Sequence, residues 1–96
     1  MASTIKVQIV TASVPESSRE RYLGAWAEWS GSLFAMGIRS ELLECEDEPG
    51  TFTELTWLEL GEEGALADDR MVRINDELSA AAERRVGDQR LHARVE

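Results

Sequence analysis

Hydrophobic and polar positions along the chain show two periodicities, one of two residues and one with the spacing of a helix. Ile5, Val7 and Ile9 alternate with Lys6 and Gln8, which is the pattern of a half-buried strand. An apolar stripe at helical spacing comes next and is formed by Tyr22, Trp26, Trp29 and Leu33. The two periodicities alternate along the chain in an order that predicts strand, helix, strand, strand, helix and strand.

Turn and capping signals place the ends of the first helix and of a hairpin. The run 17–20 fits a capping box, so the helix is expected to begin there, and Gly37 is placed to end it. Strands are expected over about 38–46 and 51–60. The segment 47–50 between them contains Pro followed by Gly, which favours a tight turn and therefore a hairpin.

A second helix is expected over about 62–86, with a weak beginning because Gly64 lies in its first turn. Gly87 is expected to end it, and a last strand over 91–95 returns to the sheet. This order is the split β-α-β pair of ferredoxin-like folds. We predict one α+β domain over residues 1–96, with a βαββαβ order, a four-stranded antiparallel sheet and both helices on one face.

Apolar residues occupy both faces of the predicted sheet, although two helices can cover only one. In the third strand Phe52 and Leu58 point one way, whereas Leu55 and Trp57 point the other. An uncovered patch of this kind usually marks an association surface. We therefore expect a homodimer that packs sheet against sheet through the open sheet face.

The charge distribution argues against nucleic acid and membrane surfaces as partners. The 96-residue chain carries a net charge of −9, and its segment 40–69 has eleven acidic residues and no Lys or Arg. Such a segment repels phosphate backbones and anionic lipid heads. A solvated face is the simpler interpretation of this segment, and a docking surface for a basic partner or a cation is the alternative.

The only cysteine, Cys45, excludes an intramolecular disulfide and fits a reducing compartment. We expect it to be a small buried hydrophobe, with a reactive thiol as the alternative. Lys6 and Gln8 interrupt the first apolar stretch, so neither a signal peptide nor a membrane span is expected. These features predict a soluble cytoplasmic protein.

The turn at 47–50, the segment 52–57 and the acidic, Ala-containing turn 60–66 after it resemble the dimeric α/β barrel superfamily. The resemblance covers nearly the whole chain and is greatest to the small antibiotic-biosynthesis-monooxygenase-type members. It implies a dimer with a pocket between the helices and the sheet of each subunit. Members include cofactor-independent oxygenases, haem-degrading enzymes, isomerases and proteins without known activity, so it implies no single reaction.

The haem-degrading members use an Asn on the first strand, a Trp on the third and a His in the following helix. Trp57 matches the Trp, but the first strand has no Asn and Asp69 stands where the His is expected. The only histidine, His92, is in the last strand and is interpreted as an exposed or interface residue, with a general base as the alternative. We expect no cofactor, and the catalytic residues, if any, stay unknown.

The carboxylates near the hairpin lack the spacing of a regular ligand loop, so no metal site is expected. Glu54 differs from them because it shares a strand face with Phe52 and Leu58. If that face is buried, Glu54 needs a partner or a raised pKa and becomes a candidate acid or base. The simpler interpretation, which we prefer, is an edge position from which Glu54 reaches water or an Arg.

Tyr22, Trp26, Glu54 and Trp57 are the residues we select as candidate lining of a ligand pocket. Aromatic residues at helical spacing also fit a plain core and dimer interface, and that interpretation stays open. The predicted function is a homodimer that is non-catalytic or binds a small apolar or aromatic ligand between helices and sheet. The alternative is a cofactor-independent monooxygenase or isomerase acting on a small aromatic or polyketide-like molecule.

Overall fold

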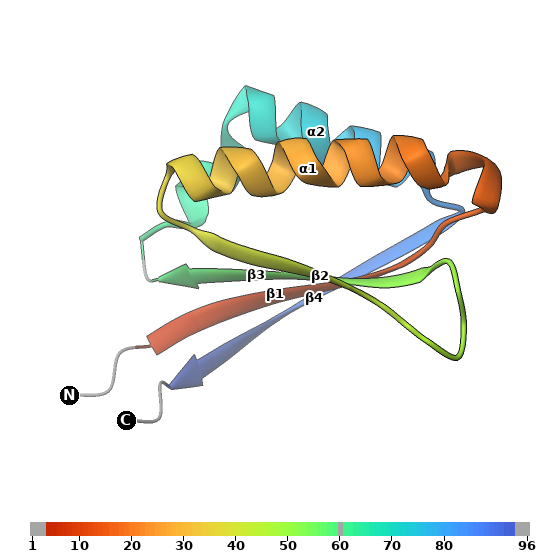
Figure 1. The fold of residues 1–96 in the computed structure, drawn as a ribbon. Coiled ribbons are helices and arrows are strands. Elements are labelled where there is room, and N and C mark those ends of the chain that lie inside the picture. The colour runs from red at the N-terminus through yellow and green to blue at the C-terminus, as the bar shows by residue number, and fades with distance from the viewer. Residues whose placement is uncertain (1–3, 60, 94–96) are drawn as a thin grey trace.

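The computed structural model describes residues 4–59 and 61–93 and has the predicted order of elements (Figure 1). In chain order these are β1 (Thr4–Ser13), α1 (Arg19–Ala35), β2 (Arg39–Glu44), β3 (Thr51–Glu59), α2 (Asp69–Ala81) and β4 (Arg84–Ala93). Short 3-10 helices, η1 (Glu16–Ser18) and η2 (Glu63–Ala67), precede α1 and α2. Both long helices lie on the same side of the sheet.

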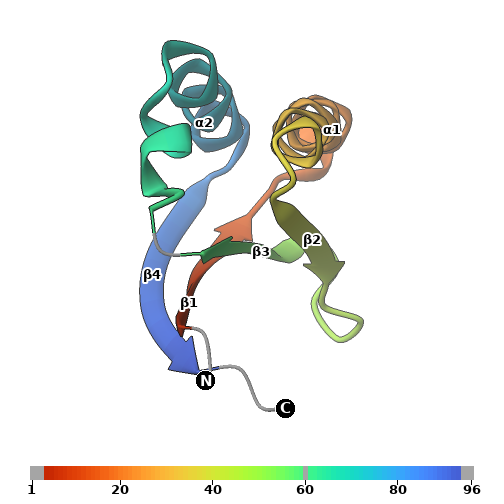
Figure 2. The same cartoon turned by 90° about the vertical axis from the view of Figure 1, so that its left-hand side faces the viewer.

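The sheet is antiparallel, with the strand order β2-β3-β1-β4. β1 and β3 are the two inner strands, and their register pairs Val7 with Trp57 and Val10 with Glu54. In Figure 2, α2 lies over the β4 side of the sheet and α1 over the β2 side. The predicted βαββαβ fold with helices on one face is therefore confirmed for the single chain.

The first helix begins and ends where the sequence predicts, but without the predicted cap. Gly37 has φ +77°, and the Ile38 N–H donates to the Leu33 carbonyl at 2.9 Å, which closes the helix through a left-handed residue.

At its other end α1 begins at Arg19, inside the run 17–20. Ser17, the expected cap, lies in η1. The N-cap is Ser18 instead, and it makes no side-chain capping bond to the residues that the structure describes. The predicted capping box is therefore wrong, because the chain enters α1 from the turn of η1.

The second half of the chain corrects two predicted boundaries. The helix ends at Ala81 rather than near residue 86, and β4 begins at Arg84 rather than at residue 91. Antiparallel pairing with β1 extends over all ten β4 residues, from Ser13–Arg84 to Thr4–Ala93, and this tertiary term outweighs local helix preference. The weak beginning is confirmed as the separate 3-10 helix η2. Residue 60 of the predicted third strand and residues 94 and 95 of the predicted last strand lie outside the described residues.

Burial along β3 follows the expected alternation. Phe52, Glu54, Thr56 and Leu58 face the helices and are at most 3% exposed, whereas Leu55 and Trp57 face the other side and are partly exposed. The core between helices and sheet is filled by large side chains with almost no exposed surface, namely Tyr22, Leu33, Phe52, Leu58, Met71, Ile74 and Leu78. None of the described helices has the length and apolar content needed to cross a bilayer.

The sheet face without helices carries apolar side chains at its centre. Val7 pairs with Trp57 there, Ile9 pairs with Leu55, and Val86 on β4 is 53% exposed. The guanidinium of Arg39 lies over the Trp57 ring, 4.6 Å from its centroid. The prediction of apolar residues on both faces is confirmed, and the second face is open in the single chain.

Candidate functional site

A cavity of about 330 Å³ lies between α2, η2 and the helix-facing side of the sheet. Its walls include apolar side chains from α1, β3 and α2 and polar side chains from β1 and α2, namely Trp29, Leu58, Val72, Lys6, Gln8 and Asn75. A volume near 300 Å³ with mostly apolar walls and a few polar groups is typical of small-molecule sites. This cavity is the candidate ligand site.

Gln8 is the most unusual side chain in this lining. It lies on β1 opposite Thr56 of β3, on the face that Val10 and Ala12 share. Its Oε1 atom is buried and accepts no hydrogen bond from any residue that the structure describes. Burying an unpaired carbonyl costs about 1 to 3 kcal/mol, so a ligand that donates a hydrogen bond to it would recover that cost.

An ion pair lies at the edge of the cavity. The Lys6 Nζ atom is 3.4 Å from Glu63 Oε1, and the two side chains are 25% and 38% exposed. Backbone N–H groups, first that of Glu63 itself and then that of Gly61, hold the pKa of the Glu63 carboxyl below its ordinary value. The pair therefore joins β1 to η2 and puts a cationic donor beside the cavity at neutral pH.

Behind the cavity, Glu54 is buried in a charged network and is 3% exposed. Arg85 donates to it twice, from Nε to Oε2 at 2.9 Å and from Nη2 to Oε1 at 2.6 Å. The Tyr22 hydroxyl donates to Oε2 at 2.7 Å, and burial raises the pKa of Tyr22 well above its ordinary value, with the Glu54 carboxylate adding to the shift. The preferred interpretation of Glu54 as an edge residue reaching water is wrong because β3 is an inner strand, but its Arg partner is confirmed.

The same arginine connects this network to the cavity lining. Its Nη1 atom donates to Asn75 Oδ1 at 2.7 Å, to the Asn75 carbonyl at 3.3 Å and to Ser79 Oγ at 3.0 Å. Asn75 is on α2 and lines the cavity, whereas Arg85 is on β4 and its side chain is 9% exposed. One guanidinium therefore ties the sheet to the inner side of α2.

The structure brings together only part of the predicted pocket set. Tyr22 and Glu54 are in direct contact, and Trp26 is buried in the same core. Trp57 is on the opposite face of the sheet, where it borders a surface depression with Ile5 and Arg39. Of the residues that the structure describes, the cavity lining includes none of these four.

Sequence reasoning missed the residues that do line the cavity or support it. Gln8 was used only as the polar partner in an alternating strand, although it shares a face with Val10. The predicted helix over 62–86 includes Arg85, which lies in β4 in the structure. Nothing in the sequence around Asn75 marks it as a lining residue. The one available signal was a polar side chain on the helix-facing side of an inner strand.

The other candidate residues stand apart from the cavity. Cys45 is exposed just after β2, so the expectation of a buried thiol is wrong because the chain has already left the sheet there. His92 is paired with Ile5 in the β4 register, and its side chain lies outside the described part. Within the described ranges, no group of three or more His, Cys, Asp or Glu side chains is arranged to hold a metal ion.

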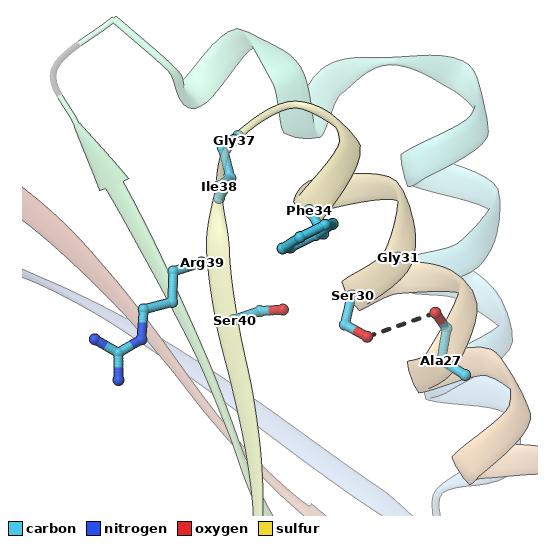
Figure 3. Close-up of a pocket in the computed structure, with 8 residues that line it drawn as sticks. All are labelled: Ala27, Ser30, Gly31, Phe34, Gly37, Ile38, Arg39 and Ser40. Atoms are coloured by element: carbon cyan, nitrogen blue, oxygen red, sulfur yellow. Dashed lines mark hydrogen bonds between the residues drawn. The ribbon is translucent and has the colours of Figure 1, made fainter.

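A second depression, of about 730 Å³, lies between α1 and the edge strand β2 (Figure 3). Figure 3 shows the Phe34 ring between the helix and the strand, with Arg39 directed away on the far side of β2. Phe34 is 83% exposed, and the Ser30 hydroxyl is bonded back to the Ala27 carbonyl at 3.5 Å. Among the described residues that line this wide groove, the one charged side chain, Arg39, is directed away from it. The smaller cavity is the stronger candidate because it contains the buried acceptor without a partner, Gln8 Oε1.

Comparison with solved structures identifies the fold. A conserved protein from Methanosarcina mazei has a TM-score of 0.78 and 13% identity over 94% of this chain and 91% of its own. A proposed antibiotic biosynthesis monooxygenase from Caulobacter crescentus has a TM-score of 0.79 and 13% identity over 99% of this chain and 92% of its own. A variant of SnoaB, a cofactor-independent oxygenase from Streptomyces nogalater, has a TM-score of 0.75 and 15% identity over 99% of this chain and 96% of its own.

No protein-family model matches the sequence, and no curated protein does. The three structural neighbours are at most 15% identical to the chain, so the likeness is one of fold. It extends over nearly the full length of both partners in each comparison, and the antibiotic-biosynthesis-monooxygenase type of fold is therefore the one that this chain adopts.

Proposed function

We propose that this protein is a homodimer whose subunits each bind a small aromatic ligand in the cavity between α2, η2 and the sheet. The observation that carries the proposal is the unpartnered Gln8 Oε1 atom beside an otherwise largely apolar cavity. A purely structural core would be more stable with an apolar residue at this position. Keeping a buried acceptor without a donor is explained when the donor comes from a ligand.

The walls indicate the kind of ligand. The Trp29 indole offers a flat surface, and Leu58 and Val72 offer aliphatic contacts. A cavity of about 330 Å³ has room for a molecule of two fused rings. The polar groups of Gln8 and Asn75 would then fix the orientation of such a molecule through one or two hydrogen bonds.

The open sheet face supports the homodimer part of the proposal. Its apolar centre, which includes Val7, Leu55 and Trp57, has polar neighbours such as Glu41 and Thr11 around it. An apolar centre with a polar rim is the usual anatomy of a protein interface. Sedimentation of Leu55→Lys is expected to give a monomer where the unaltered protein gives a dimer, and a monomeric unaltered protein would contradict this part.

Ligand binding is tested by calorimetric titration with 6-hydroxy-α-tetralone, a two-ring aromatic ketone whose phenol can donate to Gln8 Oε1. We expect binding to the unaltered protein and a marked loss in Val72→Phe, because the larger ring fills the cavity. Leu23→Phe is the matched control, since Leu23 is 37% exposed on α1 and is not part of the cavity lining. Absence of heat with the unaltered protein, or equal affinity in Val72→Phe, would contradict the proposal.

A cofactor-independent monooxygenase or isomerase is the second candidate function. Lys6 and Asn75 can donate hydrogen bonds to an oxyanion that develops on a bound substrate, which is the stabilisation that such reactions need. The SnoaB neighbour, described as a cofactor-independent oxygenase, shares the fold. Oxygen uptake with a panel of aromatic quinols tests it: uptake that is lost in Val72→Phe supports an enzyme, and no uptake leaves the binding function alone.

A further inference from the structure

The hydrogen bonds of Arg85 fix the orientation of a side chain that lines the cavity. Its guanidinium can only donate, so the atom of Asn75 that faces Nη1 at 2.7 Å has to be the amide oxygen. No hydrogen bond joins the Asn75 Nδ2 group to an acceptor among the described residues. Because Asn75 lines the cavity, Nδ2 is the donor that this side chain has available for a ligand there. The orientation follows from the chemistry of the guanidinium, which has no acceptor of its own.

Each guanidinium nitrogen of Arg85 makes a hydrogen bond of its own. Nε and Nη2 donate to Glu54, at 2.9 and 2.6 Å, and Nη1, which donates to Asn75, also donates to Ser79 Oγ at 3.0 Å. Tyr22 holds the Glu54 carboxylate from the α1 side at 2.7 Å. With Glu54 3% and Arg85 9% exposed, water does not compete with these bonds, so the guanidinium has one available position.

We propose that Arg85 is the positioning residue of this cavity and that it makes the cavity selective for a ligand with a carbonyl or another hydrogen-bond acceptor facing Asn75. Arg85 keeps the Asn75 amide from turning, so Nδ2 is always presented as a donor. An acceptor on the ligand gains this bond without the cost of orienting the amide. The inference rests on the proposed function, because it concerns ligands of the same cavity.

The test compares two molecules that share a phenol donor and differ only in a carbonyl group, 6-hydroxy-α-tetralone, here the ketone, and 6-hydroxytetralin. The ratio of their affinities isolates the hydrogen bond from the apolar contacts, which both molecules make. We expect the unaltered protein to prefer the ketone by about two- to tenfold, the value of one hydrogen bond. Asn75→Asp keeps an acceptor for Arg85 but removes the donor, so the preference should disappear or reverse.

Arg85→Lys tests the positioning role directly. A single ammonium group cannot bind Glu54 at both oxygens and also hold Asn75, so the amide is free to turn and the ketone preference should fall toward one. Arg21→Lys is the matched control, because it makes the same change in the exposed Arg21–Glu77 pair, which is outside the cavity lining and the Arg85 network, and should leave the ratio unchanged. If Arg85→Lys does not fold, the double substitution Glu54→Leu with Arg85→Met removes the ion pair as a unit and should abolish the preference in the same way.

The outcomes separate this inference from the proposed function. Absence of binding of both molecules to the unaltered protein overturns the proposed function and the inference with it. Binding of both molecules with the same ketone preference in the unaltered protein and in Arg85→Lys, or in the double variant, overturns the positioning role alone. A preference that is lost in these variants while 6-hydroxytetralin still binds supports it.

Discussion

Removal of the Glu54 charge gives the sharpest energetic prediction. The carboxylate accepts three hydrogen bonds, two from Arg85 and one from Tyr22, at 2.9, 2.6 and 2.7 Å. In Glu54→Gln one of the two oxygens becomes an NH₂ group, which cannot accept from any of these donors. The Arg85 charge is then left buried without a counter-ion, and breaking a buried pair in this way costs about 3 to 5 kcal/mol.

That cost is a large fraction of the total stability. A folded chain of 96 residues has a free energy of unfolding of about 5 to 14 kcal/mol, so Glu54→Gln is expected to lower it by about a fifth or more. Glu54→Leu combined with Arg85→Met removes both charges and leaves no unpaired ion. The double variant should therefore lose at least about 2 kcal/mol less than the sum of the two single variants.

Urea unfolding of the unaltered protein, Glu54→Gln, Glu54→Leu, Arg85→Met and the double variant measures these differences. All five are compared at one fixed protein concentration, because association would otherwise shift the midpoints. The reasoning would be refuted if the losses of the two single substitutions add within about 0.5 kcal/mol, since independent sites add in that way. A loss below about 1 kcal/mol in Glu54→Gln would likewise mean that the network does not exclude water.

Three further predictions concern stability. Gln8→Met removes the unpaired buried carbonyl and should raise the free energy of unfolding by about 1 kcal/mol while weakening the binding of 6-hydroxy-α-tetralone, whose phenol loses its acceptor, as unfolding and calorimetry would show. A side-chain hydrogen bond from Arg19 lowers the pKa of Glu44 to about 2 from an ordinary 4.5. The contribution of the Glu44 carboxylate to stability is therefore present above about pH 4.5 and is lost as the pH falls through about 2. The difference in stability between the unaltered protein and Glu44→Gln should shrink over that range. Gly37→Ala should lower the free energy of unfolding by about 1 kcal/mol because φ is +77° there. The matched Gly24→Ala lies inside α1, where an added Cβ meets nothing within 4 Å, and should raise it by about 0.5 to 1 kcal/mol. Thermal unfolding distinguishes the two signs.

The fold could be predicted because local signals agreed with tertiary structure over most of the chain. Gly37 and Gly50 both have positive φ, at +77° and +93°, where the sequence placed a helix end and a turn. The boundary between α2 and β4 was missed because the Ala-rich run around residue 81 favours helix locally, and only pairing with β1 shows that Arg84 begins a strand.

The candidate site was less predictable because it is assembled from distant parts of the chain. Gln8, Trp29, Asn75 and Arg85 come from four different elements, and their proximity depends on sheet register and helix packing. Glu54 was a partial exception. Alternation along one strand placed its carboxylate on the face of Phe52 and Leu58 and made an Arg one of its expected partners, but the preferred edge position was wrong. The identity of that partner needed the corrected course of β4.

The three Trp side chains permit a direct test of where a ligand binds. Trp26 is in the core, Trp29 lines the cavity and Trp57 is on the open sheet face, so their indole N–H resonances report on three separate places. On titration of isotope-labelled protein with 6-hydroxy-α-tetralone, we predict that the Trp29 indole signal moves most and that the Trp57 signal moves little. No movement at Trp29, or a larger movement at Trp57, would contradict a ligand cavity between α2 and the sheet.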